Sequence, residues 1–168
     1  MSGGFDGKIF IYEGKESELI GEIQESGGKN AHGGGIYAVS WCNTSRSFLS
    51  CSGDKTCKIW DVETKKATTT FNLGNAVEDQ QLGCLWSGNY MISVSLSGHI
   101  NYLDPRTPEK PVKVVSGHNK PITKMIKGNW IDIFLCWFIF ELKAFKVALF
   151  LDRDLWLFFM VIFIRNKW

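Results

Sequence analysis

A twelve-residue pattern that occurs three times constrains the fold more than any other feature of this sequence. In each copy, small residues lead into a tight turn, and an alternating run then ends at an acidic residue. The copies, which align without gaps, are residues 2–13 (SGGFDGKIFIYE), 50–61 (SCSGDKTCKIWD) and 93–104 (SVSLSGHINYLD). Tyr12, Trp60 and Leu103 are equivalent, which gives spacings of 48 and 43 residues. A period of this length predicts a chain built from similar structural units.

Each unit contains four short segments typical of strands, rich in β-branched and aromatic residues and bounded by Gly, Asn, Ser or Asp. In the best unit they are residues 36–41, 48–52, 57–62 and 67–71, and in the next they are 82–86, 90–95, 99–104 and 111–115. A period near 40–45 residues with four strands per unit is typical of a β-propeller.

The sequence therefore predicts an all-β fold over residues 1–123, a partial β-propeller with antiparallel four-stranded blades. The chain is expected to open on the last two strands of an earlier blade. The predicted parts are a blade remnant at 2–23, blades at 31–71 and 75–115, and the start of another blade at 117–123.

The second copy resembles the WD-repeat consensus, in the run from Asp54 to residue 61 (DKTCKIWD), with His32 in the usual place of the loop histidine. The resemblance implies one hydrogen-bonded network inside the blade, made by His32, a strand serine (Ser50 or Ser52), Asp54 and Trp60. A half-buried carboxylate that accepts turn N–H groups and an imidazole N–H would order the turn. The next blade lacks this pattern, because serine replaces the aspartate and leucine the tryptophan, and we expect it to rely on packing.

Several longer runs resemble the actin-interacting protein 1 family more specifically: residues 32–41 (HGGGIYAVSW), 79–86 (DQQLGCLW) and 93–104. The likeness covers roughly 120 residues, about two and a half blades of the first propeller. It implies a cytoplasmic protein of the actin cytoskeleton, which binds actin filaments and promotes their disassembly together with cofilin. The alternatives are a generic WD-repeat scaffold for protein–protein interaction, and a truncated product without independent function.

Contact residues for actin or cofilin cannot be matched to the family by motif. Loop positions on the predicted propeller faces are the candidates, because recognition surfaces are often built on loops. Glu78, Asp79 and Gln80 are such candidates by position, and turn formation is the alternative explanation for each of them.

Residues 124–168 carry no blade pattern and contain 12 of the 23 aromatic residues. We expect this tail to be unrelated to the propeller and helical, because it is long and nearly free of Gly and Pro. We consider three interpretations of this tail. It is sequence that does not belong to the evolved domain, a helical cap on an open blade edge, or a membrane hairpin through 131–164. The apolar runs 133–140 and 155–164 are short for membrane helices.

Composition and motifs argue against catalysis and against a cofactor. The net charge of +2 is spread without a basic stripe, so no nucleic-acid partner is expected. The three histidines and five cysteines do not form a zinc pattern, and the cysteines are expected to be reduced thiols, mostly buried. The Gly33–Gly35 run lacks the lysine and the helix of a phosphate-binding loop.

Overall fold

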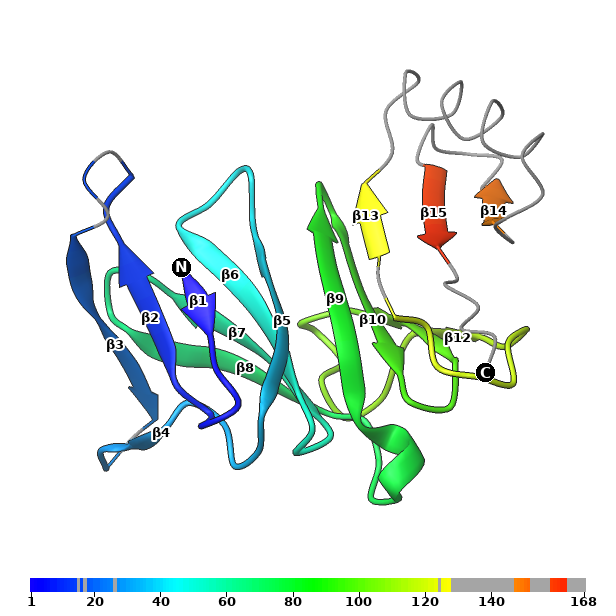
Figure 1. The fold of residues 1–168 in the computed structure, drawn as a ribbon, viewed down its shortest axis with the longest axis horizontal. Helices are drawn as coiled ribbons and strands as arrows, with labels where there is room; N and C mark the ends of the chain where they lie inside the picture. Colours follow the sequence, from blue (N-terminus) through cyan, green and yellow to red (C-terminus); the bar gives the residue numbers. More distant parts are fainter. Residues whose placement is uncertain are drawn as a thin grey trace, which may run out of the picture. The chain divides into compact units, whose positions relative to one another are not determined.

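The computed structural model describes residues 1–14, 16, 18–25, 27–123, 125–127, 147–151 and 158–162. The chain forms two compact units, Met1–Pro121 and Ile122–Trp168. The first unit holds three four-stranded antiparallel sheets (Figure 1). The second unit has a three-stranded sheet of its own.

The second sheet is the most regular of the three. Its strands are consecutive in the chain and are joined by tight turns. They are β5 (Ile36–Trp41), β6 (Ser47–Ser52), β7 (Thr56–Asp61) and β8 (Lys66–Asn72). Trp41, Phe48 and Trp60 stand opposite one another across three strands, and Phe48 stacks on both tryptophans. Such cross-strand aromatic pairs help to fix the register.

The third sheet has the same order, after a single turn of 3₁₀-helix, η1 (Val77–Asp79). Its strands are β9 (Gln81–Ser87), β10 (Tyr90–Ser95), β11 (Ile100–Leu103) and β12 (Lys113–Val115). All eight strands of the second and third sheets lie close to the segments that the sequence predicts.

The first sheet differs from the prediction of two strands at the start of the chain. It has four strands, in the order β1-β2-β3-β4. They are β1 (Ser2–Gly3), β2 (Ile9–Tyr12), β3 (Leu19–Glu25) and β4 (Lys29–Asn30). The outer two are only two residues long, too short to show an alternating pattern in the sequence.

Alternation along β7 divides its side chains between two hydrophobic cores. Cys57 and Ile59 face the third sheet, whereas Trp60 faces the first. The core between the first and second sheets contains Ile9, Ile11, Ile23, Ala31, Ile36, Phe48 and Trp60. The core between the second and third sheets contains Leu49, Cys51, Cys57, Ile59, Phe71, Cys84, Met91 and Leu103. The second sheet is therefore covered on both faces.

The same turn recurs in all three sheets, at equivalent positions of the repeat. Gly7, Lys55 and Gly98 have φ values of 76°, 71° and 86°. A Cβ atom at Gly7 would lie 2.4 Å from the carbonyl oxygen of His32, and one at Gly98 would lie 2.9 Å from that of His118. The two glycines thus allow a histidine loop to approach the preceding turn closely.

The prediction of a helical tail is wrong for the tail residues that the structure describes. They form β13 (Met125–Lys127), β14 (Val147–Leu151) and β15 (Phe158–Ile162), in the antiparallel order β13-β15-β14. The runs VALFL and FFMVI are rich in aromatic and β-branched residues, which favour strands, and five apolar residues carry no helical period. The other residues of 131–164, including Cys136, lie outside the described part.

Candidate functional site

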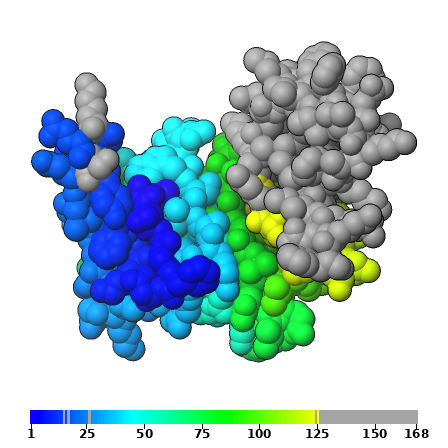
Figure 2. Space-filling model, in the orientation of Figure 1, coloured from blue at the N-terminus to red at the C-terminus, as the bar shows by residue number. Residues whose placement is uncertain are grey.

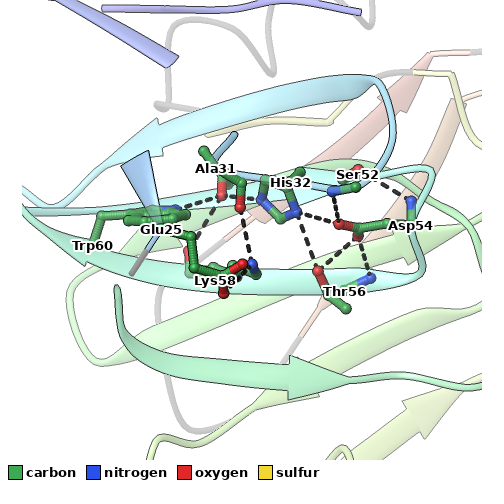
Figure 3. A network of polar contacts seen from close by, with 10 residues as sticks. Glu25, Ala31, His32, Ser52, Asp54, Thr56, Lys58 and Trp60 are labelled. Carbon is green, nitrogen blue, oxygen red and sulfur yellow. Dashed lines mark hydrogen bonds and ion pairs between the residues drawn. The ribbon is translucent and has the colours of Figure 1, made fainter. Parts of the chain in front are cut away.

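Among the residues that the structure describes, the largest polar cluster links the loop before β5 to the β6–β7 turn (Figure 3). His32 contacts Asp54 through Nδ1 at 2.8 Å and Ser50 through Nε2 at 2.7 Å. Trp60 donates from Nε1 to the Ser50 hydroxyl at 2.8 Å. Ser52 lies at the turn, where its Oγ accepts a hydrogen bond from the Asp54 backbone N–H at 3.1 Å. The structure thus brings together all five residues singled out in the sequence, with Ser50 and Ser52 in different roles.

The Asp54 carboxylate is the electrostatic centre of this network. Gly33 N–H donates to Oδ2 at 2.9 Å, and the backbone N–H and hydroxyl of Thr56 donate to Oδ1 at 3.0 and 2.7 Å. Partial burial raises the pKa of Asp54, but the hydrogen bonds that its carboxylate accepts from His32 and Thr56 outweigh the effect of burial. The pKa therefore lies well below its ordinary value, and the group is ionised at neutral pH.

The hydrogen bonds also indicate which atoms of the network donate and which accept. Because Trp60 donates to Ser50, the Ser50 hydroxyl is free to donate its own proton to His32 Nε2, and Nδ1–H then donates to Asp54. The alternative acceptor for Ser50 is the Lys58 carbonyl, at the longer distance of 3.5 Å. The distances favour the arrangement in which His32 donates from Nδ1 to Asp54 and accepts from Ser50 at Nε2. Every proton is then used inside the blade, which is an arrangement for rigidity rather than for proton transfer to a substrate.

The third sheet compensates for the missing network with different polar contacts. Ser97, at the position of Asp54, contacts Ser95 Oγ at 2.7 Å and His99 Nδ1 at 3.0 Å. Asn101 donates to the fully buried Gln81 at 3.4 Å. The expectation that this blade relies on packing is therefore only partly right, since serine, histidine and amide side chains hold its turn and its first strand.

Lys58 is a buried cation that joins the first two sheets. Its ammonium lies 2.9 Å from Glu25 Oε1 and 2.9 Å from the carbonyl oxygen of Ala31, and 5.6 Å from the centre of a Trp60 ring (Figure 3). The Lys58 side chain is 7% exposed, whereas Glu25 is 42% exposed. Most of the desolvation in this ion pair therefore falls on the lysine.

Because Lys58 is much more buried than Glu25, substitutions of the two residues are expected to lower the unfolding free energy by different amounts. Glu25→Gln is expected to lower the unfolding free energy by about 1–2 kcal/mol, because it leaves the buried Lys58 charge poorly compensated. Lys58→Met is expected to lower it by less than about 1 kcal/mol, because it removes the buried charge and leaves Glu25 in contact with water. Urea unfolding of both variants measures the difference, and an equal or reversed order would contradict it.

A second surface gathers at the end of the sheets where the β1–β2 and β4–β5 loops and η1 lie (Figure 1). Phe5 and Tyr37 are 79% and 43% exposed, and their rings meet edge to face at 5.4 Å. Gly53 lies between Tyr37 and Gln80, because a Cβ atom there would be 3.2 Å from the Tyr37 ring and 3.9 Å from the Gln80 amide carbon. We call Phe5, Tyr37, Gln80 and the adjoining Glu78 and Asp79 the loop surface.

The three sequence candidates on the loop surface differ in what they do. The Asp79 carboxylate accepts a hydrogen bond from the Ala76 N–H at 2.9 Å, so it holds its own loop. The backbone carbonyl of Gln80 accepts from the Leu96 N–H at 2.8 Å. The Glu78 side chain is exposed. Of the three, Glu78 is the side chain most available to a partner.

The described residues do not contain a metal-binding arrangement of three or more His, Cys, Asp or Glu side chains. Within that same part of the chain, no helix has the length and apolar character to cross a membrane. Cys42, Cys51, Cys57 and Cys84 are free and buried. Burial raises the pKa of Cys57, and a hydrogen bond with Cys84, together with burial, raises that of Cys51.

Comparisons with known proteins place this geometry in a family. The family described as "WD domain, G-beta repeat" matches residues 25–61. WD repeat-containing protein 1 of Xenopus tropicalis is 57% identical over 128 residues, which is 76% of this chain and 21% of the relative. Actin-interacting protein 1 of Drosophila melanogaster is 53% identical over 122 residues, 73% of this chain and 19% of the relative. This chain is a WD-repeat protein.

The matched family region contains the whole polar network, from Glu25 through His32 to Asp61. WD repeat-containing protein 1 of Gallus gallus gives a similar match, 55% over 117 residues, with 70% of this chain and 19% of the relative covered. The WD-repeat chain thus spans about a fifth of the length of these relatives. Their identity to it is high enough to establish homology.

Sequence reasoning missed three residues of the WD-repeat network and its surroundings. Thr56 follows Asp54 by two positions, the spacing at which an Asp side chain bonds the backbone ahead of it, and this was a usable signal. Lys58 faces the first core, as the alternation along β7 implies, but its partner Glu25 is 33 positions away. No local pattern connects these two residues.

Proposed function

We propose that this chain forms part of an actin-interacting WD-repeat protein that acts, together with cofilin, in the disassembly of actin filaments in the cytoplasm. The observation that carries the proposal is the identity of 53% to the Drosophila protein named actin-interacting protein 1, over nearly three quarters of this chain. The protons of the polar network are all used internally, which supports a binding role rather than a catalytic one.

The loop surface is the part of the chain that we assign to the partner. Exposed aromatic side chains are enriched among the residues that dominate binding energy at interfaces. Phe5 and Tyr37 form such a pair, with Phe5 in the β1–β2 loop and Tyr37 near the start of strand β5. Glu78, two positions before Gln80 in the chain, adds an exposed negative charge, which suits a partner surface with basic residues.

Co-sedimentation with actin and cofilin tests the function. We expect the chain to pellet with cofilin-decorated filaments and to increase the actin that remains in the supernatant. The double variant Phe5→Ala/Tyr37→Ala is expected to weaken this binding about tenfold or more, because it removes both aromatic anchors.

The matched control is Leu19→Ala/Ile20→Ala, which removes two side chains that are 59% and 52% exposed at the start of β3. This pair lies away from the loop surface, and its removal is expected to leave co-sedimentation unchanged. Pelleted actin that stays the same with and without the chain would contradict the proposed function. Equal loss in both double variants would remove the assignment to the loop surface.

A further inference from the structure

The loop between β11 and β12 carries a sequence pattern that neither the polar network nor the loop surface uses. Residues 104–112 read DPRTPEKPV. Thr107 is the only serine or threonine of this chain that proline follows directly, and Lys110 stands three positions after it. A hydroxyl residue with proline next to it and a basic residue at the third position is the pattern that cyclin-dependent protein kinases recognise in their substrates.

Both parts of this pattern have a physical reason. Proline has no backbone N–H, so it is accepted where the groove of a kinase offers no acceptor to the backbone of the substrate. Any other residue would leave an N–H without a partner at that position. An exposed lysine nearby adds attraction to acidic groups beside the groove.

The structure presents this segment to solvent. Thr107, Glu109 and Lys110 are exposed, and Pro108 is partly buried. The strand that follows the loop, β12, is the edge strand of the third sheet. Part of the segment after β11, yellow in Figure 2, is visible at the surface. A kinase can therefore reach the Thr107 hydroxyl without separating the strands of the sheet.

Hydrogen bonds hold the loop near its two ends. At the first end, Arg106 Nε donates to both carboxylate oxygens of Asp104 at 3.0 Å, and the Thr107 N–H donates to the Asp104 carbonyl at 3.0 Å. At the other end, the Val112 N–H donates to the carbonyl of Tyr102 at 2.8 Å. The segment between these ends is an exposed turn. Binding to a kinase therefore rearranges a local turn and leaves both hydrophobic cores in place.

We propose that Thr107 is a phosphorylation site for a proline-directed protein kinase of the cyclin-dependent class. In the reaction, the Thr107 hydroxyl oxygen bonds to the γ-phosphorus of Mg²⁺-bound ATP. The bond from that phosphorus to the β–γ bridging oxygen breaks, and ADP leaves. The hydroxyl proton passes to the aspartate base of the kinase. The proposal does not depend on an interaction with actin.

Phosphorylation of Thr107 would reverse the sign of the net charge of the loop. Residues 104–113 contain three basic and two acidic side chains. A phosphate adds a charge of about −1.5 to −2. It also offers the guanidinium of the neighbouring Arg106 an acceptor in competition with Asp104. The modification thus changes the electrostatics of an exposed loop.

Incubation of the full chain with a purified cyclin-dependent kinase, its cyclin and radiolabelled ATP tests the proposal. Stoichiometric labelling is expected, with the phosphate found on Thr107 by mass spectrometry. Thr107→Ala is expected to abolish the label. Pro108→Ala is expected to lower kcat/KM by at least about tenfold, because alanine brings a backbone N–H for which the groove has no acceptor. Lys110→Ala is expected to lower it by about fivefold, the effect of losing an exposed charge contact.

Thr64→Ala is the matched control. Thr64 also lies in an exposed turn with a lysine beyond it, Lys66, but the residue that follows it directly is lysine instead of proline. This variant is expected to be labelled like the original chain. A peptide of residues 102–113 (YLDPRTPEKPVK), labelled in parallel, separates recognition of the sequence from access to it in the fold.

Three results would overturn the proposal. Absence of label from both the peptide and the chain would show that the kinase does not recognise the pattern. Label on the peptide alone would show that the folded loop does not offer Thr107 to the kinase. Label that Thr107→Ala retains in full would place the phosphate on another residue.

Discussion

Replacement of Trp60 by alanine is expected to lower the unfolding free energy by about 3–5 kcal/mol, the usual cost of truncating a buried aromatic residue. The indole is completely buried between the first and second sheets and stacks on Phe48, with ring centres 6.4 Å apart. Truncation also leaves the Ser50 hydroxyl without its donor. Because domains are stable by only about 5–15 kcal/mol, the loss is a large share of the total. Guanidinium unfolding followed by circular dichroism measures it.

Trp41→Ala is the matched control. Trp41 also stacks on Phe48, with ring centres 6.2 Å apart, but it is 42% exposed. Its loss is expected to lower the unfolding free energy by about 1 kcal/mol. Trp60→Phe should fall between the two, since it keeps an aromatic ring but loses the hydrogen bond to Ser50 and part of the buried ring. Similar losses for Trp60→Ala and Trp41→Ala would show that burial in the first core does not stabilise the fold as we infer.

The strands of the second and third sheets could be predicted from the sequence because short-range signals specify them. A turn such as residues 53–55, between two alternating runs, determines both strand ends and the register between them. The polar network could be expected for a related reason: the repeat places His32 and the Asp54 turn at fixed spacings, and the WD-repeat resemblance gives each residue a partner. Because these features recur along the chain, a sequence pattern that is weak in one copy can be recognised by comparison with the others.

Features that depend on a single long-range contact could not be read in the same way. The pairing of Lys58 with Glu25 joins two sheets, and the contact of Phe5 with Tyr37 joins the β1–β2 loop to strand β5. Each is decided by how the sheets pack and not by local spacing. The substitute contacts of the third sheet are similar, since Gln81 reaches Asn101 only because β9 and β11 lie in one sheet.

Composition alone could not predict the secondary structure of the tail. A low content of Gly and Pro removes turn signals without choosing between helix and strand. In β14 and β15, five-residue apolar runs pair with each other, so that Leu149 lies opposite Met160. An apolar run of this length fits a strand as well as one turn of helix, and pairing with a distant run decides the outcome.

Asp54→Asn is expected to lower the unfolding free energy by about 2–4 kcal/mol at neutral pH. The carboxylate accepts hydrogen bonds from His32, Gly33 and Thr56, and one oxygen must become an NH₂ donor in the variant. If that group faces the His32 side, the N–H of Gly33 and the Nδ1–H of the buried His32 side chain both lose their acceptor. Urea unfolding at pH 7 measures the loss.

The same substitution is expected to change the pH dependence of stability, with a sign that follows from the lowered pKa of Asp54. In the unfolded chain the carboxyl takes up a proton near its ordinary pKa of 3.8, whereas in the folded chain it resists protonation to lower pH. Its contribution is therefore complete above about pH 5 and is lost progressively as the pH falls from about 4 towards 2. The difference in unfolding free energy between the wild-type chain and Asp54→Asn should shrink over that window.

Asp61→Asn is the control, because it changes an aspartate that holds an exposed turn rather than the polar network of the blade. Hydrogen bonds from the backbone N–H and the hydroxyl of Thr64 lower the pKa of Asp61, but its carboxylate faces solvent. Solvent and salt screen such a group, so its removal should change stability much less, and added salt should reduce even that change. The Asp54 effect should persist in salt, because the donors are half-buried and fixed by the blade. A constant gap between the wild-type chain and Asp54→Asn from pH 7 to pH 2.5 would mean that the ionised carboxylate does not hold the blade together.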